Sequence, residues 1–222
     1  MAQDIFTRFR GGCMMLLRKD GDTVVFLGTA FLAHPDGFLL TTAHNIQGRE
    51  HLLVAPQETS TAFEPTTSET VTSCEVDLIA IDETHDLALL KLRHEFDITC
   101  PDHMIGVPDE TPPGSGVMWL GYPFGFQHIF NQFIRQSLIA AKIKTQADVD
   151  VFLFDGAVHP GMCGAPLIAA DDRRVIGVVG GLFVPPHAKE VGEPSVPSLQ
   201  FSFAVSIKYG VALLEAQGAT IV

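Results

Sequence analysis

Three short segments of this 222-residue chain carry side chains that could act as a base, an acid and a nucleophile. His44 stands in TTAHNI directly after an apolar run, Asp86 stands in THDLALLKL directly before one, and Cys163 stands in HPGMCGAPLI. Taken singly, each has a plain structural explanation: a histidine that caps a turn, an acid that ends a loop and a buried cysteine. Taken jointly, a thiol, an imidazole that accepts its proton and a carboxylate that orients the imidazole could attack a carbonyl group.

Such residues can act together only if the surrounding elements bring distant parts of the chain close. The apolar segments are short, β-rich and bounded by Gly, Pro, Asp or polar clusters, which is typical of strands. They form two series, at residues 23–33, 37–42, 51–55, 74–81 and 86–92, and at residues 116–122, 137–143, 151–154, 166–170, 174–181 and 201–207. Many short strands separated by turns predict a sandwich or barrels. One helix is expected at residues 207–217, because Gly218 follows where a C-cap glycine belongs.

The overall composition excludes some function classes. Lys and Arg number 14 against 26 Asp and Glu, which gives a formal net charge of -12. Binding to a phosphate backbone requires clustered cations, so nucleic acid is not an expected partner. Apolar residues make up 46% of the chain, enough to bury a substantial core.

No metal or cofactor is expected. The four cysteines, Cys13, Cys74, Cys100 and Cys163, lie far apart and form no C-x-x-C pair. The nine histidines include no H-E-x-x-H or other close ligand pair.

The N-terminal segment and the cysteine pattern lead us to expect a cytoplasmic location. The first apolar run, residues 13–17, is too short for a secretory signal. No stretch approaches the ~18 apolar residues of a membrane span, so no membrane association is expected. No disulfide is evident, which favours a reducing compartment.

Three polar segments read as connections or loops. Residues 100–116 would join the two series of strands, and residues 56–70, rich in Thr and Ser, would form a surface loop. Residues 183–200 hold four prolines and are too irregular for a strand or helix. Long loops of this kind are often functional.

The order and context of these motifs resemble one family. GTAFLAHPDGFLLTTAHNI resembles the strand–turn–strand–His segment of trypsin-like peptidases, and its P-D-G turn is similar to the HtrA/Deg branch. THDLALLKL resembles the segment with the family's aspartate, FLFDGAVHPGMCGAPLI the nucleophile segment and WLGYPFGF the G-x-P-F-G stretch of the second HtrA barrel. RVIGVVGG and FSFAVSI are similar to the two strands that follow the nucleophile. The similarity runs from about Thr23 to the terminal helix.

The resemblance implies an all-β fold of two packed, six-stranded antiparallel barrels with a C-terminal helix. The barrels would comprise residues 1–104 and 105–222, together one peptidase domain. Protein or peptide would be the substrate, and no cofactor is implied. Because HtrA relatives are often trimers built through N-terminal segments, a trimer is one expectation. Ile5, Phe6 and Phe9 could serve such contacts, but we expect them to cover the barrel.

The resemblance also implies the roles of individual residues. His44, Asp86 and Cys163 would form the catalytic triad, and the backbone N–H groups of Gly161 and Cys163 would form the oxyanion hole. Gly161 would permit a backbone conformation that side chains resist. The substrate pocket would be formed by Ala157 at its floor together with Val179, Gly180, Gly181 and Phe201, the last of which would narrow it. Since none of these residues is charged and Asp155 is expected to point elsewhere, cleavage should follow Ala, Val, Ile or Leu.

Some positions depart from the family pattern. Cysteine replaces the usual serine at position 163, and Met162 stands where secreted relatives place an aspartate that binds a cleaved N-terminus. Thr29 and Asn45 are not the disulfide cysteines of those relatives. Two alternatives remain open: a serine peptidase carrying an introduced cysteine at position 163, and a non-catalytic binding domain on the same fold.

Overall fold

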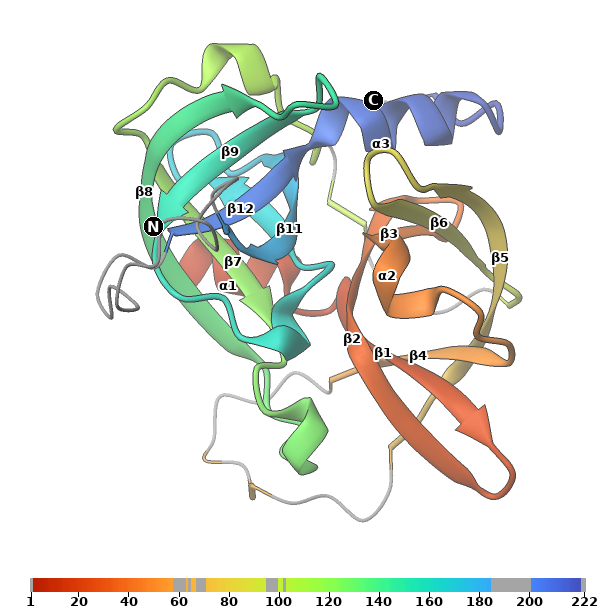
Figure 1. The fold of residues 1–222 in the computed structure, drawn as a ribbon. Helices are drawn as coiled ribbons and strands as arrows, with labels where there is room; N and C mark the ends of the chain where they lie inside the picture. The colour runs from red at the N-terminus through yellow and green to blue at the C-terminus, as the bar shows by residue number, and fades with distance from the viewer. Residues whose placement is uncertain are drawn as a thin grey trace, which may run out of the picture.

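The computed structural model describes residues 2–57, 63, 65, 66, 71–94, 100, 101, 103–184 and 201–220. Two closed six-stranded barrels lie side by side, with the helix α3 across one end of both (Figure 1). All pairs of neighbouring strands are antiparallel. The prediction of an all-β, trypsin-like fold with a C-terminal helix is confirmed.

The first barrel closes in the order β1-β2-β3-β6-β5-β4. Its strands are β1 (Cys13–Asp20), β2 (Thr23–His34), β3 (Phe38–Thr42), β4 (Leu52–Pro56), β5 (Cys74–Asp82) and β6 (Leu87–Leu92). Side chains that alternate inward along these strands fill the interior, Leu16, Leu39 and Leu90 among them. The interior is therefore a packed core.

The second barrel repeats this arrangement in the order β10-β11-β12-β9-β8-β7. Its strands are β7 (Gly116–Gly121), β8 (Phe133–Lys144), β9 (Asp150–Asp155), β10 (Pro166–Ala169), β11 (Val175–Leu182) and β12 (Phe201–Ser206). Trp119, Phe152 and Phe154 contribute the largest side chains to its interior.

The helices are short and lie outside the barrels or between strands. They are α1 (Ala2–Phe9), α2 (Ala43–Ile46) and α3 (Ile207–Glu215), with the 3-10 turns η1 (Pro108–Glu110), η2 (Gly125–Gln127) and η3 (Pro160–Met162). Ile5 and Phe9 of α1 are buried, so the expectation that they cover the barrels is confirmed. Helix α3 packs against β6 of one barrel and β11 of the other.

A third core lies between the barrels. It joins residues of α1 and α3 to Leu40 and Leu89 of the first barrel and to Val178 and Val205 of the second. Gly210 of α3 comes so close to this core that a Cβ there would lie 2.6 Å from Leu40 Cδ1. The two barrels are thus held against one another by buried apolar surface, which fixes residues carried by one barrel relative to those of the other.

Two elements differ from the sequence-based expectation. Residues 2–9 form a helix and residues 13–20 a strand, neither of which was predicted. In β1 five successive residues are buried, since it packs on both faces and lacks the alternation that marks a half-exposed strand. Most of the two predicted loops, 56–70 and 183–200, lies outside the described residues. The boundary at 104/105 falls between the last strand of one barrel and the first of the other, and stays a prediction.

Candidate active site

His44 lies in α2, the single turn that follows β3, and Asp86 holds it by two bonds. The His44 N–H donates to Asp86 Oδ1 at 2.9 Å, and Nδ1 lies 2.6 Å from Oδ2. An ionised carboxylate only accepts hydrogen bonds, so Nδ1 carries a proton and Nε2 faces away from the acid. This fixes the orientation of the ring and keeps a proton on Nδ1.

Asp86 is itself held in an unusual backbone conformation. It ends the turn between β5 and β6 with φ of 53°, in the left-handed region that Asp tolerates better than most residues. Its carbonyl oxygen accepts the Ala43 N–H at 3.0 Å. Asp86 therefore binds α2 through three acceptors, two on the side chain and one on the backbone.

Cys163 lies at the end of η3 in the second barrel and is 7% exposed. Its thiol lies near enough to the His44 ring to affect the pKa of that ring. The bond to Asp86, followed by the neighbouring Cys163 thiol, raises the pKa of His44 to about 10, against the opposing effect of partial burial. The structure thus brings together the three residues predicted as a triad, from two barrels and three separate segments.

Two first-barrel residues, Thr29 and Asn45, hold the nucleophile loop, and sequence reasoning assigned them no role. The Thr29 N–H and Asn45 Nδ2 both donate to the Cys163 carbonyl, at 3.0 and 2.9 Å. Thr29 Oγ1 also donates to the Gly161 carbonyl at 2.7 Å. Both side chains are buried. A polar residue within or beside an apolar segment that must be buried needs a partner, and that signal could have pointed to them.

The glycines of the nucleophile loop are required mainly for space. A Cβ on Gly161 would lie 2.1 Å from the Tyr122 carbonyl oxygen, and its φ is not in the left-handed region. A Cβ on Gly164 would lie 2.0 Å from the Thr29 carbonyl oxygen, and there φ is +89° as well. Glycine was predicted at position 161 for its conformational freedom. The structure instead requires it because the backbone between β7 and η2 passes too close for a side chain.

One donor of the predicted oxyanion hole has an internal acceptor. The Cys163 N–H donates to the Pro160 carbonyl at 3.3 Å, within the turn η3. The prediction of two donors turned toward a substrate carbonyl therefore does not match this conformation. The physical reason is that a 3-10 turn pairs each N–H with the carbonyl three residues earlier.

Some of the residues predicted to form the substrate pocket lie near Cys163, and others do not. A Cβ on Gly181 would be 3.7 Å from Cys163 Sγ, so β11 passes directly beside the nucleophile. Val179 is fully buried in the interior of the second barrel, in one cluster with Val158 and Ala204. Ala157 lies in the segment before η3, which Ser202 ties to β12 through the Gly156 carbonyl and the Val158 N–H.

An aromatic residue beside Gly180 and Gly181 is Phe203, which the sequence analysis did not name. The predicted narrowing of the pocket by Phe201 stays a prediction. Phe203 pairs with Gly181 across the sheet, and its ring lies 2.3 Å from where a Cβ on Gly180 would be. Phe201 pairs with Asp155 at the start of β12. A β-bulge between Val179 and Gly181 shifts the register, and such a bulge is not readable from strand alternation. Asp155 is exposed, in keeping with its expected direction away from the pocket.

Aromatic rings flank the nucleophile loop at β2 and η2, next to Gly161. Phe26 lies 3.1 Å from where a Cβ on Gly161 would be, and its ring meets that of Phe126 edge to face. Phe124 meets Phe133 in the same manner and lies 5.8 Å from the ring of His159. We call Phe26, Phe124, Phe126 and Phe133 the aromatic patch. All but Phe26 are more than a third exposed.

Within the described part of the chain, no group of three or more His, Cys, Asp or Glu side chains could hold a metal ion. In the same residues no helix is long and apolar enough to cross a membrane.

Comparison with known proteins agrees with the two-barrel fold. The family described as "Trypsin-like peptidase domain" matches residues 28–178. The structure of the HtrA-type protease AlgW with a decapeptide covers 97% of this chain at a TM-score of 0.73 and 19% identity, and the match spans 67% of that chain. The MamO protease domain from Magnetospirillum magneticum covers 93% of this chain and 97% of its own, at a TM-score of 0.67 and 15% identity. At these identities the two structures support the fold alone.

Sequence relatives are of the same kind but much longer. A probable periplasmic serine endoprotease, DegP-like, of Pseudomonas fulva is 28% identical over 160 residues, or 71% of this chain. Serine protease HTRA1 of Xenopus laevis is 26% identical over 154 residues, or 68% of this chain. The matched parts are 29% and 30% of these relatives, so this chain spans less than a third of their length. The expected resemblance to trypsin-like peptidases of the HtrA branch is confirmed.

The expectation of a cytoplasmic location is wrong by the same comparison. Relatives from Pseudomonas fulva, Pseudomonas savastanoi and Ectopseudomonas mendocina are described as periplasmic endoproteases. The sequence argument rested on a short apolar run and on the scattered cysteines, and neither feature overrides these relatives.

The raised pKa of His44 makes one contribution to stability depend on pH. The pKa of His44 is 6.5 in the unfolded chain and about 10 in the folded one, so its protonation stabilises the fold fully below pH 6.5. That contribution is lost as the pH rises through about 10. We therefore expect the difference in unfolding free energy between the wild type and Asp86→Asn to shrink between pH 6.5 and 10. The His44 side chain is 46% exposed, so solvent screening keeps the effect modest.

Denaturant midpoints measured across this range check the prediction. Asn is the matched replacement because it tolerates the left-handed backbone of residue 86. His128→Asn, which replaces an exposed left-handed histidine, is the control and should show no such trend. A gap between wild type and Asp86→Asn that stays constant from pH 6.5 to 10 would contradict the assigned bond.

Proposed function

The chain belongs to the trypsin-like peptidase domain family, and we propose that it is an endopeptidase that uses Cys163, His44 and Asp86 as its catalytic triad. The observation that carries the proposal is the position of the His44 ring. Nδ1 is bound to Asp86 at 2.6 Å, and the thiol of Cys163 lies near the same ring. Because the acid contacts the base and the base lies beside the nucleophile, the arrangement supports acyl transfer.

In the resting pair the proton would already lie on His44, whose pKa of about 10 keeps the ring charged at neutral pH. Free cysteine has a pKa of about 8.5, and only its thiolate is a strong nucleophile. The carboxylate of Asp86 stabilises the imidazolium that results. Attack of sulfur on the peptide carbonyl then forms a tetrahedral oxyanion, and His44 returns the proton to the leaving amine. Water, deprotonated by His44, would release the acyl group and regenerate the thiol.

Stabilising the oxyanion requires a change at η3. The Cys163 N–H must leave the Pro160 carbonyl before it can donate to a substrate oxygen. One weak turn bond at 3.3 Å is exchanged for a charge-assisted one, which is roughly twice as strong as a neutral bond. We propose that a bound substrate makes this exchange, with Gly161 supplying the second N–H.

The same internal bond is the observation that favours the alternative, a non-catalytic binding domain. A domain that never formed an oxyanion would have no use for a free donor at Cys163. The orientation of His44 by two bonds to Asp86 speaks for catalysis, because binding alone does not need an imidazole ring held in one orientation. The two readings differ in whether the purified protein cleaves a peptide.

The site favours an apolar substrate. Ala157, Gly180 and Gly181 carry no charge, and the interior behind them is formed by Val158, Val179 and Ala204. A buried cation would need a partner that these residues do not offer. The aromatic patch on the other side of η3 offers apolar contact to the polypeptide beyond the scissile bond. By resemblance to the DegP-like relatives we propose the periplasm as the place of action.

The triad should behave as one unit. Cys163→Ala and His44→Ala should each lower kcat/KM on an unfolded protein substrate by at least about a thousandfold, and the double variant should lose little more. Asp86→Ala should lose less than the roughly 10⁴-fold drop of the corresponding change in a serine triad, because a thiol needs less help to ionise. Initial rates on casein give the comparison. Full turnover by Cys163→Ala would show that some other group performs the reaction.

Substrate choice gives a separate test. Cleavage should follow small or medium apolar residues such as Ala, Val, Ile or Leu, with Lys and Arg rejected. Mass spectrometry of the fragments from casein or a peptide library identifies the cut sites. Phe203→Ala should widen the range to larger residues, while Leu138→Ala, at an exposed position of β8, should not. A majority of cuts after Lys or Arg would show that an acid such as Asp155 faces the pocket.

A further inference from the structure

The turn that carries Asp86 holds a second histidine–aspartate pair, formed by Asp82 and His85. The His85 N–H donates to Asp82 Oδ1 at 3.1 Å, and His85 Nδ1 lies 2.6 Å from Asp82 Oδ2. This repeats the pattern at His44, where one carboxylate binds both the N–H and the ring of a histidine. The two side chains are 22% and 25% exposed, so solvent screens the pair only in part. The pair fixes the turn immediately before Asp86.

The His85 ring is stacked on Tyr209 of α3. The ring centroids are 3.7 Å apart and the planes differ by 21°. Such a pair contributes attraction beyond its buried area. It also joins a turn of the first barrel to a helix that continues directly from β12 of the second.

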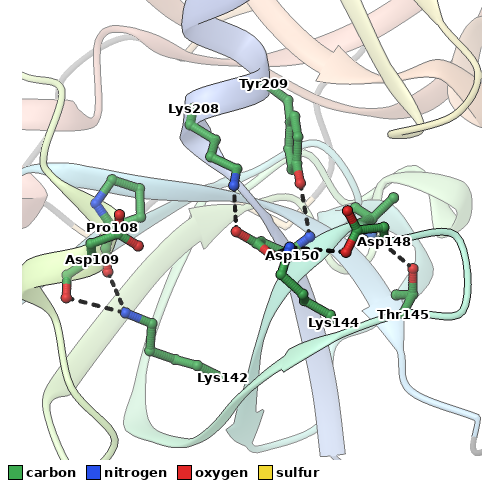
Figure 2. A network of polar contacts seen from close by, with 10 residues as sticks. Pro108, Asp109, Lys142, Lys144, Thr145, Asp148, Asp150, Lys208 and Tyr209 are labelled. Carbon is green, nitrogen blue, oxygen red and sulfur yellow. Dashed lines mark hydrogen bonds and ion pairs between the residues drawn. The ribbon is translucent and has the colours of Figure 1, made fainter.

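Tyr209 is in turn anchored to the second barrel. Figure 2 shows Tyr209 and the neighbouring Lys208 both reaching Asp150 at the start of β9. The Asp150 N–H donates to the Tyr209 hydroxyl at 2.9 Å, and Lys208 pairs with the Asp150 carboxylate. Lys144 of β8 binds the same carboxylate at 2.9 Å. The position of the Tyr209 ring is therefore set by the β8–β9 hairpin.

We propose that His85 and Tyr209 are positioning residues for Asp86: their stack lets the second barrel, which carries the nucleophile, hold the acid that orients His44 in the first barrel. Neither residue touches the reacting atoms. For its catalytic consequence the inference rests on the proposed peptidase function, whereas its effect on His44 does not.

The backbone of Asp86 explains why such support is needed. A non-glycine residue with φ of 53° is strained, and the conformation persists only where the surroundings over-determine it. Three bonds to α2 act on one side of Asp86, and the Asp82–His85–Tyr209 contacts act on the turn at its other side. Without the stack, the turn is free to relax, and the carboxylate shifts away from His44 Nδ1.

The direct test is the titration of His44 by NMR in the 222-residue chain. Among the described residues, Asp86 and Cys163 are the groups that raise the pKa of His44, so spectra are recorded in a Cys163→Ala background, which removes the thiol and keeps the acid. The His44 signal is assigned by its loss on His44→Ala. Tyr209→Leu removes the stack, and Tyr209→Phe is the matched control that keeps the ring and loses only the hydroxyl.

We expect Tyr209→Leu to lower the pKa of His44 by roughly one unit or more, the size of effect that an opposite charge exerts. Tyr209→Phe, which keeps the stack and loses the bond to Asp150, should lower the pKa of His44 clearly less than Tyr209→Leu does. A purely structural role for Tyr209 would lower thermal stability but leave the His44 titration unchanged. Equal His44 titrations in the Leu and Phe variants would overturn the inference.

Kinetics of the same substitutions with Cys163 present give the second readout. Tyr209→Leu should lower kcat about tenfold or more with KM unchanged, since small misplacements of catalytic groups cost up to about 10²-fold. If the wild type is inactive but Tyr209→Leu still lowers the pKa of His44, the proposed function is wrong and the inference holds. If the wild type is active but Tyr209→Leu changes neither the pKa of His44 nor kcat, only the inference is wrong.

Tyr209 also packs against the core between the barrels, so a variant in the turn gives an independent route. If Tyr209→Leu does not fold, His85→Leu should show the same lowered pKa of His44. His85→Phe, which keeps a ring for the stack, should restore it in part. If neither substitution at His85 changes the pKa of His44, the inference is likewise overturned.

Discussion

The bond between Asp86 and His44 is the contact on which the rest of the site depends. It joins the turn after β5 to the single turn α2, and it uses both oxygens of the carboxylate and the backbone of residue 86. The bond to Asp86 is the largest cause of the raised pKa of His44. A base with this preference for its proton can draw one from a thiol. Everything else in the site places Cys163 where that proton transfer can occur.

Placing Cys163 is a problem of joining two barrels. The apolar core between them sets their distance, and Thr29 and Asn45 then tie the carbonyls of the nucleophile loop to the first barrel. Gly161 and Gly164 allow this approach, since a Cβ at either would overlap a backbone oxygen. Thr29 and Asn45 are themselves buried. The loop is thereby fixed without a covalent link, while η3 keeps its own internal bond.

Sequence predicted the parts of this arrangement that short motifs carry. His44, Asp86 and Cys163 each stand at the edge of an apolar strand, so the strands and the three residues were found together. Contacts across more than a hundred residues, such as Asn45 to Cys163, leave only a weak mark, a polar side chain in an apolar setting. The bulge in β11 shifts the register so that Phe203 pairs with Gly181. This bulge and the peptide orientation in η3 depend on backbone angles, which residue types alone do not fix. Helix α1 was missed because a segment of only eight residues forms no stable helix by its own propensity. Its stability comes from burial of Ile5 and Phe9.

Selective alkylation of Cys163 tests the central claim most directly. A brief treatment of the native protein with iodoacetamide at neutral pH, followed by peptide mapping, measures the four thiols side by side. Burial raises the pKa of Cys13 far above its usual range and raises that of Cys74, whereas Cys163 contacts the His44 ring. Cys163 should be labelled first, and His44→Ala should slow its labelling while leaving that of Cys74 unchanged. Equal labelling of all four cysteines, or labelling of Cys163 that ignores His44→Ala, would contradict the triad.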